Sequence, residues 1–179
     1  MREEYMPIQF TVFKKDVIAQ EGVFCKVQAV ANRLHDFLNL DGTQKQLEER
    51  HVVGASSAGI QEIILNEARE LGFQSEKKGL FTNYEVTALR PDYYFRTDGA
   101  GILLEVERGK TIANNMDLLD LWKCHICSNA TYLFLLVPQF RPSRNGRMTA
   151  QFSHVAKRLA PFFEAGNHVN VDAVFLFGY

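Results

Sequence analysis

The stretch of sequence that decides the fold is RPDYYFRTDGAGILLEVER, residues 90–108. Two segments rich in aromatic and aliphatic residues, 90–97 and 101–108, flank the dipeptide Asp98-Gly99. This dipeptide between two such segments is typical of a two-residue hairpin turn, because both central positions of the turn need a positive φ. We therefore predict an antiparallel β-hairpin.

The turn also predicts which residues face each other. A turn at residues 98–99 places Asp92 opposite Glu105, and Arg90 opposite Glu107. Directly opposed side chains share one face of a hairpin, with Cβ atoms roughly 5 Å apart. Glu105 and Glu107 share that face because strand side chains repeat every two residues. The other face collects Tyr93, Phe95, Ile102, Leu104 and Val106, which form a coherent core face.

This register brings three carboxylates together on the hairpin. Two opposed carboxylates with a third one step away destabilise the hairpin unless something compensates their charge. Mg²⁺ is a natural compensation, because it takes oxygen ligands and keeps other positions for water and substrate phosphates. Such an ion can polarise a phosphoryl oxygen and activate water. The alternative is that the acids pair with Arg90, Arg96 or Arg108 on the surface, and geometry alone leaves both interpretations open.

The elements on either side of the hairpin complete an α/β pattern. In chain order we expect a helix capped by Ser57 and stopped at Gly72, a strand over 74–77, the hairpin, a helix from Asn114 or Asn115 to about Cys127, a strand over 131–137, a helix from about Thr149 limited by Pro161, and a strand over 171–177. The expected apolar face of the second helix consists of Leu118, Leu119, Trp122 and Ile126. The strand–helix–strand order over 101–137 implies a parallel pair, so the sheet is mixed and the fold is an α/β sandwich.

The N-terminal residues carry no motif that indicates a function. We expect an extended segment over 8–13, a helix over 23–38 and a polar turn at Asp41-Gly42. On this basis we divide the chain into a mainly helical N-terminal extension, residues 1–56, and a core, residues 57–179.

The hairpin acids also resemble a known motif. Pro91-Asp92, twelve intervening residues, and Glu105-Val106-Glu107 are similar to the PD-(D/E)xK nuclease motif, in the variant in which Glu replaces Lys, as in some type II restriction endonucleases. The α-β-β-β-α-β order over about residues 57–138 resembles the core of that superfamily. The resemblance implies a restriction-endonuclease-like α/β/α sandwich with a mixed sheet and an extra C-terminal helix and strand. It also implies Mg²⁺-dependent hydrolysis of DNA, with Mn²⁺ as a substitute.

By the same resemblance, Asp92, Glu105 and the backbone carbonyl of Val106 are metal ligands. Glu107 occupies the position of the motif lysine. A lysine there can orient the attacking water and stabilise the charge that develops on phosphate, and a carboxylate cannot do the latter. Glu107 is therefore expected to bind metal or to act as a general base.

The resemblance leaves two further roles to fill. The missing cation is expected from Lys110 or from Lys123 on the next helix, although each is otherwise an ordinary surface lysine. Members of the superfamily often add an acid from the helix before the first strand. Glu62 is the preferred candidate, and Glu67 is the rival because it lies on the apolar side of the helix.

Positive charge is concentrated in one part of a chain whose net charge is −1. Between Leu121 and Phe163 there is no Asp or Glu, but there are six cations: Lys123, Arg141, Arg144, Arg147, Lys157 and Arg158. We expect these cations, and foremost the arginines of a flexible loop over 141–147, to contact nucleic-acid phosphates or base edges. The alternative is a solvated surface that happens to be basic.

Composition supports a globular domain. Of the 179 residues 46% are hydrophobic, and the longest apolar run, Tyr132–Pro138, is too short to span a bilayer. The N-terminus lacks the pattern of a signal peptide, and three cysteines do not suggest a disulfide framework. Cys124 and Cys127 have no second pair to complete a zinc site, so packing or exposure explains them. We expect a soluble, reduced, cytoplasmic protein without membrane contact.

Together these features predict an endonuclease that acts on DNA. Cutting both strands of a duplex needs two active sites, so a homodimer is expected, with residues 1–50 as one candidate interface. Two alternatives stay open. The first is a repair, mobile-element or RNA-processing nuclease with the same core, and the second is a catalytically inactive DNA-binding module.

Overall fold

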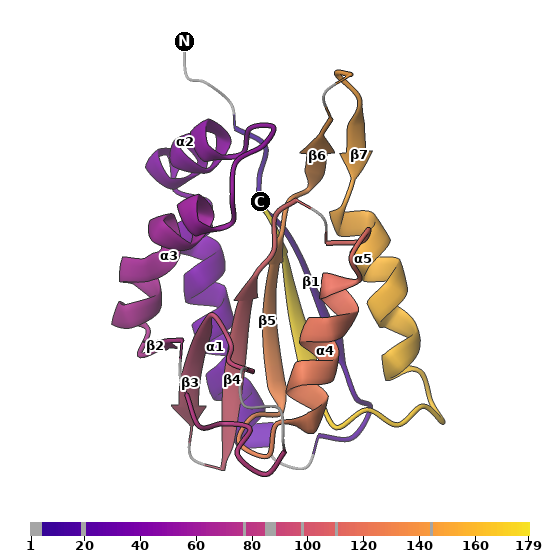
Figure 1. Cartoon of the computed structure of the whole chain (residues 1–179). Coiled ribbons are helices and arrows are strands. Elements are labelled where there is room, and N and C mark those ends of the chain that lie inside the picture. Colours follow the sequence, from indigo (N-terminus) through magenta and orange to yellow (C-terminus); the bar gives the residue numbers. More distant parts are fainter. Residues whose placement is uncertain are drawn as a thin grey trace.

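Six strands form one sheet between two layers of helices in the computed structural model (Figure 1). The structure describes residues 5–18, 21–76, 78–84, 89–97, 99–109, 111–143 and 145–179. The strands of this sheet are β1 (Gln9–Lys14), β2 (Gln74–Ser75), β3 (Tyr93–Thr97), β4 (Ala100–Val106), β5 (Tyr132–Val137) and β8 (Ala173–Gly178). Their spatial order is β1-β8-β5-β4-β3-β2. The strand β5 runs parallel to β4 and β8, and the other pairs are antiparallel, which confirms a mixed sheet.

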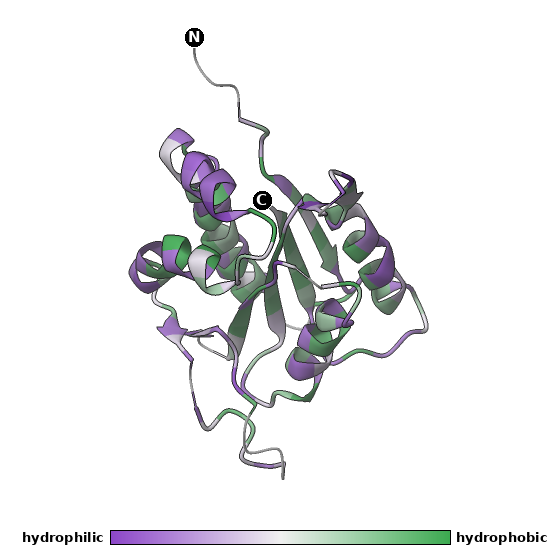
Figure 2. Ribbon diagram, turned by 45° about the horizontal axis from the view of Figure 1, so that its top comes forward, coloured by the Kyte–Doolittle hydropathy of each residue, from purple (hydrophilic) through white to green (hydrophobic). Residues whose placement is uncertain are grey.

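Helices pack on both faces of the sheet. On one face lie α1 (Glu21–Leu38) and α3 (Ala58–Glu70), and on the other lie α4 (Met116–Ile126) and α5 (Phe152–Leu159), which continues as a 3₁₀ turn, η1 (Ala160–Phe163) (Figure 1). Alternate strand residues point to the two layers, so that Leu104 packs with α1 and α3 whereas Leu103 packs with α4 and α5. Every residue of β5 and β8 is buried, and the strands are correspondingly hydrophobic (Figure 2). The predicted α/β/α sandwich is confirmed.

The hairpin has the predicted register. Thr97 pairs with Ala100 and Tyr93 pairs with Leu104, so the next position of the ladder places Asp92 beside Glu105. The turn residue Asp98 and the predicted end of the preceding strand, Lys77, lie outside the described residues.

The N-terminal residues contribute to the same sheet. As predicted, the extended segment forms a strand, β1, and it pairs with β8 along its whole length. Likewise, α1 forms over the predicted residues and buries Val27, Ala31 and Leu34 against the sheet. Residues on both sides of the proposed boundary at residue 56 therefore pack into one hydrophobic core.

The polar turn predicted at Asp41-Gly42 is wrong. These residues open a helix, α2 (Asp41–Arg50), which packs beside α3. Only Thr43, Gln44 and Leu47 are buried in α2. A helix that buries a single aliphatic side chain has no hydrophobic period, and tertiary contacts such as the hydrogen bond from Gln44 Nε2 to the Met6 carbonyl (3.2 Å) position it instead.

The flexible loop predicted over 141–147 is a short β-hairpin. The strand β6 (Phe140–Pro142) pairs with β7 (Met148–Ala150), and Thr149, the predicted start of the third helix, belongs to β7. The helix α5 begins only at Phe152, after the Gln151 amide donates to the Gln139 carbonyl (2.9 Å). Strands of three residues are too short to show an alternating pattern, which is why the sequence did not reveal this hairpin.

The buried face of α4 also differs from the prediction. Asp117, Asp120, Leu121 and Cys124 are buried, whereas the predicted core residues Leu119 and Trp122 are 46% and 43% exposed. The helix is therefore rotated so that two acids point inward. A hydrophobic period alone could not find this orientation, because the inward face is half polar.

Two further expectations concern the helix caps and membrane-spanning helices. Ser57 and Asn115 do precede α3 and α4, but neither side chain forms a capping hydrogen bond with the described residues. Within the described ranges, none of the helices is both long and apolar enough to cross a membrane.

Candidate active site

Asp92 and Glu105 each accept a hydrogen bond from the opposite strand, where β3 begins and β4 ends. The Asp92 amide donates to Glu105 Oε2 (3.2 Å), and the Val106 amide donates to Asp92 Oδ2 (2.9 Å). Backbone amides of each strand thus hold the carboxylate of the other strand. The two side chains converge as the hairpin register predicts.

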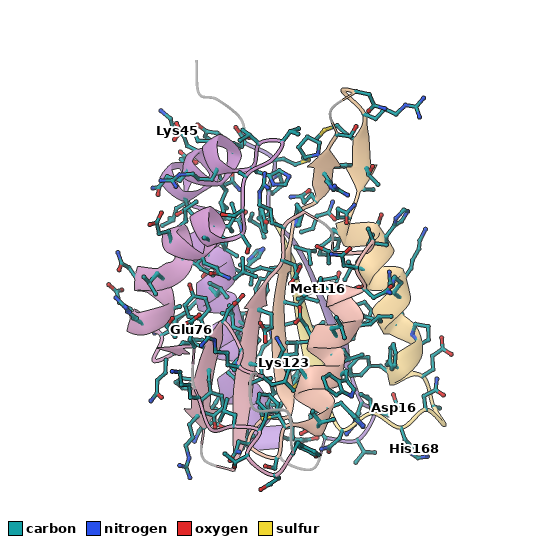
Figure 3. All side chains as sticks on the ribbon, viewed as in Figure 1. Asp16, Lys45, Glu76, Met116, Lys123 and His168 are labelled. Carbon is teal, nitrogen blue, oxygen red and sulfur yellow. The ribbon has the colours of Figure 1, made fainter. Side chains whose placement is uncertain are left out.

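A lysine and a second buried acid from α4 join this pair. Lys123 Nζ donates to Glu105 Oε1 (2.8 Å) and to Asp120 Oδ1 (3.1 Å). The Lys123 side chain is only 14% exposed, and those of Glu105 and Asp120 are buried. Figure 3 places Lys123 between α4 and the strands. The interpretation of Lys123 as an ordinary surface lysine is therefore wrong.

Carboxyl groups outnumber cations in this cluster. The carboxyl groups of Asp92, Glu105, Glu107 and Asp120 influence one another, and Lys123 is the cation among their described neighbours that lowers the carboxyl pKa values. Burial, opposed in part by Lys123, raises the pKa of Asp120 to about 6. Burial would lower the pKa of Lys123, but the Glu105 and Asp120 carboxylates more than offset it and keep the ammonium charged.

Glu107 stands at the exit of β4 beside these groups. Its carboxyl group is half-buried, and burial, together with the Asp120 and Asp92 carboxylates, raises its pKa to about 8. Arg90, which the register places opposite Glu107, instead pairs with Glu76 (3.3 Å). Among the described residues no hydrogen bond or ion pair reaches the Glu107 carboxylate. The ion pair with Arg90 that would have given Glu107 a purely structural role is therefore not formed.

The helix α3 contributes a residue other than the predicted one. Glu62 is 71% exposed and pairs with Arg50 of α2 (3.4 Å), so the structure does not bring it to the cluster. The neighbouring residue, Gln61, lies close to Asp92, and its side-chain amide favours the charged carboxylate and lowers the pKa of Asp92. One position along a helix changes the direction of a side chain by roughly 100°. Glu67, the rival candidate, is half-buried, and its side chain forms no hydrogen bond or ion pair with the described residues.

The predicted basic residues divide into two groups. Lys123 belongs to the acid cluster, and Arg158 is bound within the fold, because its Nε lies 3.2 Å from buried Asp117 Oδ2 and its guanidinium donates to Asn115 Oδ1 (2.6 Å). Lys123 and Arg158 thus pair with acids of the fold, and their contact with phosphates stays a prediction. The remaining described members are Arg141, which lines a pocket, and the exposed residues Arg147 and Lys157. Arg144 and the candidate catalytic Lys110 lie outside the described residues.

The donor set suits a hard divalent cation. Among the described residues, no three His, Cys, Asp or Glu side chains are already grouped around one point as a metal site. The cluster nevertheless offers carboxylate oxygens in excess of its one lysine, and buried Asp120 Oδ2 has no hydrogen-bond partner in the described part of the chain. An added cation would balance this charge, and oxygen ligands are those that Mg²⁺ takes.

Sequence reasoning missed Asp120 and Gln61. Asp120 lies three residues before Lys123, a spacing that puts both on one side of a helix, so the pair could have been found if the polar side of α4 had been considered. Gln61 offers no comparable signal, because an uncharged side chain on an amphipathic helix is common. The two cysteines of α4 and its end, Cys124 and Cys127, are buried and free, as the packing interpretation predicts.

The fold and the position of these acids define a class of structure, the restriction-endonuclease-like α/β sandwich. One solved structure that resembles the chain is restriction endonuclease BglII in complex with a DNA 16-mer, with a TM-score of 0.53 and 13% sequence identity. The match covers 97% of this chain and 78% of that one. No model of a known protein family matches the chain, and no curated protein matches its sequence.

Proposed function

We propose that the chain is a Mg²⁺-dependent endonuclease that hydrolyses phosphodiester bonds in DNA, most like a type II restriction endonuclease. The observation that carries the proposal is the acid cluster itself, in which Asp92, Glu105 and Glu107 meet Lys123 at the end of β4. Its place in a restriction-endonuclease-like fold supports the same function. Because a fold alone does not define the chemistry of a protein, the proposal depends mainly on the acid cluster.

The metal would be held by Asp92, Glu105 and the backbone carbonyl of Val106. When bound, Mg²⁺ supplies Lewis acidity to the phosphate and lowers the pKa of coordinated water. The amide hydrogen bonds from Val106 to Asp92 and from Asp92 to Glu105 orient both carboxylates before substrate arrives.

Glu107 and Lys123 would divide the work of the usual motif lysine. With a pKa raised to about 8, the Glu107 carboxylate is a base matched to neutral pH, and it would accept the proton of the attacking water. Lys123 stays charged between Glu105 and Asp120, and it would stabilise negative charge that develops on the phosphate oxygens. In this assignment Lys123 supplies the positive charge, although Glu107 occupies the position of the motif lysine.

A homodimer belongs to the same proposal, because one active site cleaves one strand. The dimer predicts a sedimentation mass of about twice the monomer at the protein concentration at which duplex is cut. A monomer under those conditions would instead favour a nicking activity.

Incubation of unmodified plasmid with the protein and Mg²⁺ tests the function. Glu105→Ala controls for contaminating nucleases, and EDTA controls for the metal. Discrete linear fragments would support a restriction-type endonuclease, and a smear would favour a repair-type or nonspecific nuclease. Binding without cleavage would support the inactive DNA-binding alternative, and cleavage of RNA alone would overturn the choice of DNA.

A further inference from the structure

A positively charged pocket lies next to the C-terminal end of β4. It has a volume of about 260 Å³ and is lined by residues 51–55 between α2 and α3, by Arg108 and Gly109 after β4, and by Arg141 and Pro142 of β6. In Figure 1, α2 and the β6–β7 hairpin flank the end of the sheet where β4 and β5 finish. Among the described residues that line this pocket, none carries a carboxylate.

Arg108 forms the buried wall of the pocket. It is 6% exposed, and its guanidinium donates to the backbone carbonyls of Ala55 and Val52. Its buried Nε has no hydrogen-bond partner, and no acid pairs with its charge, within the described ranges. Two carbonyls fix the guanidinium but leave its positive charge uncompensated. A buried charge of this kind is costly unless an anion joins it.

Two more side chains with polar groups line the same pocket, His51 and Arg141. His51 Nε2 bonds to the Phe140 carbonyl (2.7 Å), and the other ring nitrogen, Nδ1, is buried without a partner among the described residues. Burial, and to a lesser extent the positive charge of Arg108, lowers the pKa of His51, so its Nδ1 is a hydrogen-bond acceptor of the neutral ring and takes no part in binding an anion. Arg141 reaches the same pocket from the opposite side, from β6.

We propose that Arg108 and Arg141 form a phosphate-binding subsite, which holds a backbone phosphate of the nucleic acid close to the phosphate that is cleaved. This inference rests on the proposed function. Arg108 is three residues after Glu105, a span of at most about 10 Å of extended chain. Successive phosphates of one DNA strand advance about 3.4 Å along the helix axis, so the subsite would serve a phosphate within a few nucleotides of the cut.

The backbone around the pocket suits a close ligand. A Cβ added at Gly54 or Gly109 would meet no atom within 4 Å, so the backbone is open at both glycines. Two guanidinium groups from different elements match the tetrahedral phosphate through paired hydrogen bonds. A free phosphate or nucleotide has the same chemistry as a backbone phosphate, and the experiment separates these sources.

The test measures binding of a fluorescent DNA duplex by the full chain in EDTA, over roughly 50 to 300 mM NaCl. Arg141→Gln removes one charge from the pocket without disturbing the buried Arg108. The matched control is Arg96→Gln, which removes one exposed arginine from β3 outside the pocket. We expect Arg141→Gln to weaken binding about tenfold. The slope of log K against log salt should become shallower by about 0.9, whereas Arg96→Gln should keep the wild-type slope.

The possible results separate the phosphate-binding subsite from the proposed catalysis. A wild-type slope for Arg141→Gln would overturn the subsite even if the protein cleaves DNA. Loss of slope in Arg141→Gln with no cleavage by the wild type would support the subsite and overturn the proposed catalysis. If the wild type binds inorganic phosphate or a mononucleotide through Arg141 but does not bind duplex, the assignment to a nucleic-acid backbone is wrong. Arg108→Lys, which keeps the charge, should lose less affinity than Arg108→Met in any variant that circular dichroism shows to be folded.

Discussion

Glu107 sits at the exit of β4 with a half-buried carboxyl group and no ion-pair partner among the described residues, while Arg90 is engaged by Glu76. We expect Glu107→Ala to fold and to lose Mg²⁺-dependent cleavage by at least about a hundredfold, as removal of a general base typically does. Arg90→Ala should cut DNA at close to the wild-type rate, because its pair with Glu76 is exposed. Single-turnover cleavage rates check this, and equal rates for both variants would contradict the role of Glu107.

The raised pKa of Glu107 has a consequence for stability. In the unfolded chain the carboxyl titrates near its ordinary value of 4.5, whereas in the fold burial and the nearby acids raise its pKa to about 8. The folded state therefore binds more protons between these values, and stability contributed by protonated Glu107 is lost as pH rises from about 4.5 to 8.

We expect the melting temperature in EDTA to fall by a few degrees between pH 5.5 and pH 8.5. Glu107→Gln should show a flatter profile, because the amide cannot ionise. Mg²⁺ should restore part of the stability at pH 8.5, because it compensates the carboxylates. A Glu107→Gln profile that parallels the wild type would show that other groups cause the pH dependence.

Lys123 is the cation that the buried acids share. Replacing it with Met would leave Glu105 and Asp120 without their partner, and breaking a buried ion pair in this way costs about 3 to 5 kcal/mol. We expect Lys123→Met to lower the free energy of unfolding by about that amount in EDTA, with partial recovery in Mg²⁺. Exposed Lys157→Met on α5 is the control, with an expected change within about 0.5 kcal/mol. Urea denaturation would measure both.

At the scale of the element, the rotation of α4 decides which residues enter the site. Leu121 is 2% exposed, and Leu119 is 46% exposed. We expect Leu121→Ala to destabilise the fold by about 2 to 5 kcal/mol, and Leu119→Ala to change it by less than about 0.5 kcal/mol. Thermal denaturation of both variants checks this. The reverse order would support the apolar face that the sequence predicts, and it would turn Asp120 and Lys123 away from the hairpin.

The elements of the fold also differ in how well the sequence predicts them. The hairpin of β3 and β4 could be predicted with its register, because a two-residue turn and a hydrophobic alternation agree there. Gln61 could not, because it joins the site through the rotation of a helix against the sheet, and Asp120 could be found only from its three-residue spacing to Lys123. The strands β6 and β7 and the helix α2 also escaped prediction, since their order comes from contacts with distant segments.

At the scale of the whole molecule, one end of the sheet gathers the features that the proposed function uses. The acid cluster lies at the end of β4, the pocket of Arg108 and Arg141 follows within three residues, and β6 and β7 stand beside it (Figure 1). Ligand sites in open α/β sheets commonly lie at the carboxyl ends of strands. A nucleic acid bound across this end would meet the acids and the arginines together.

The most direct test of the central claim compares two isosteric changes of a glutamate in one cleavage assay. Glu105→Gln alters the buried acid that Lys123 and the Asp92 amide hold, and Glu62→Gln alters an exposed acid of α3. The rate of duplex cleavage in Mg²⁺ is measured for the wild type and both variants under the same conditions. The account predicts that Glu105→Gln loses cleavage by at least about a hundredfold while Glu62→Gln matches the wild type. Wild-type cleavage by Glu105→Gln would contradict it.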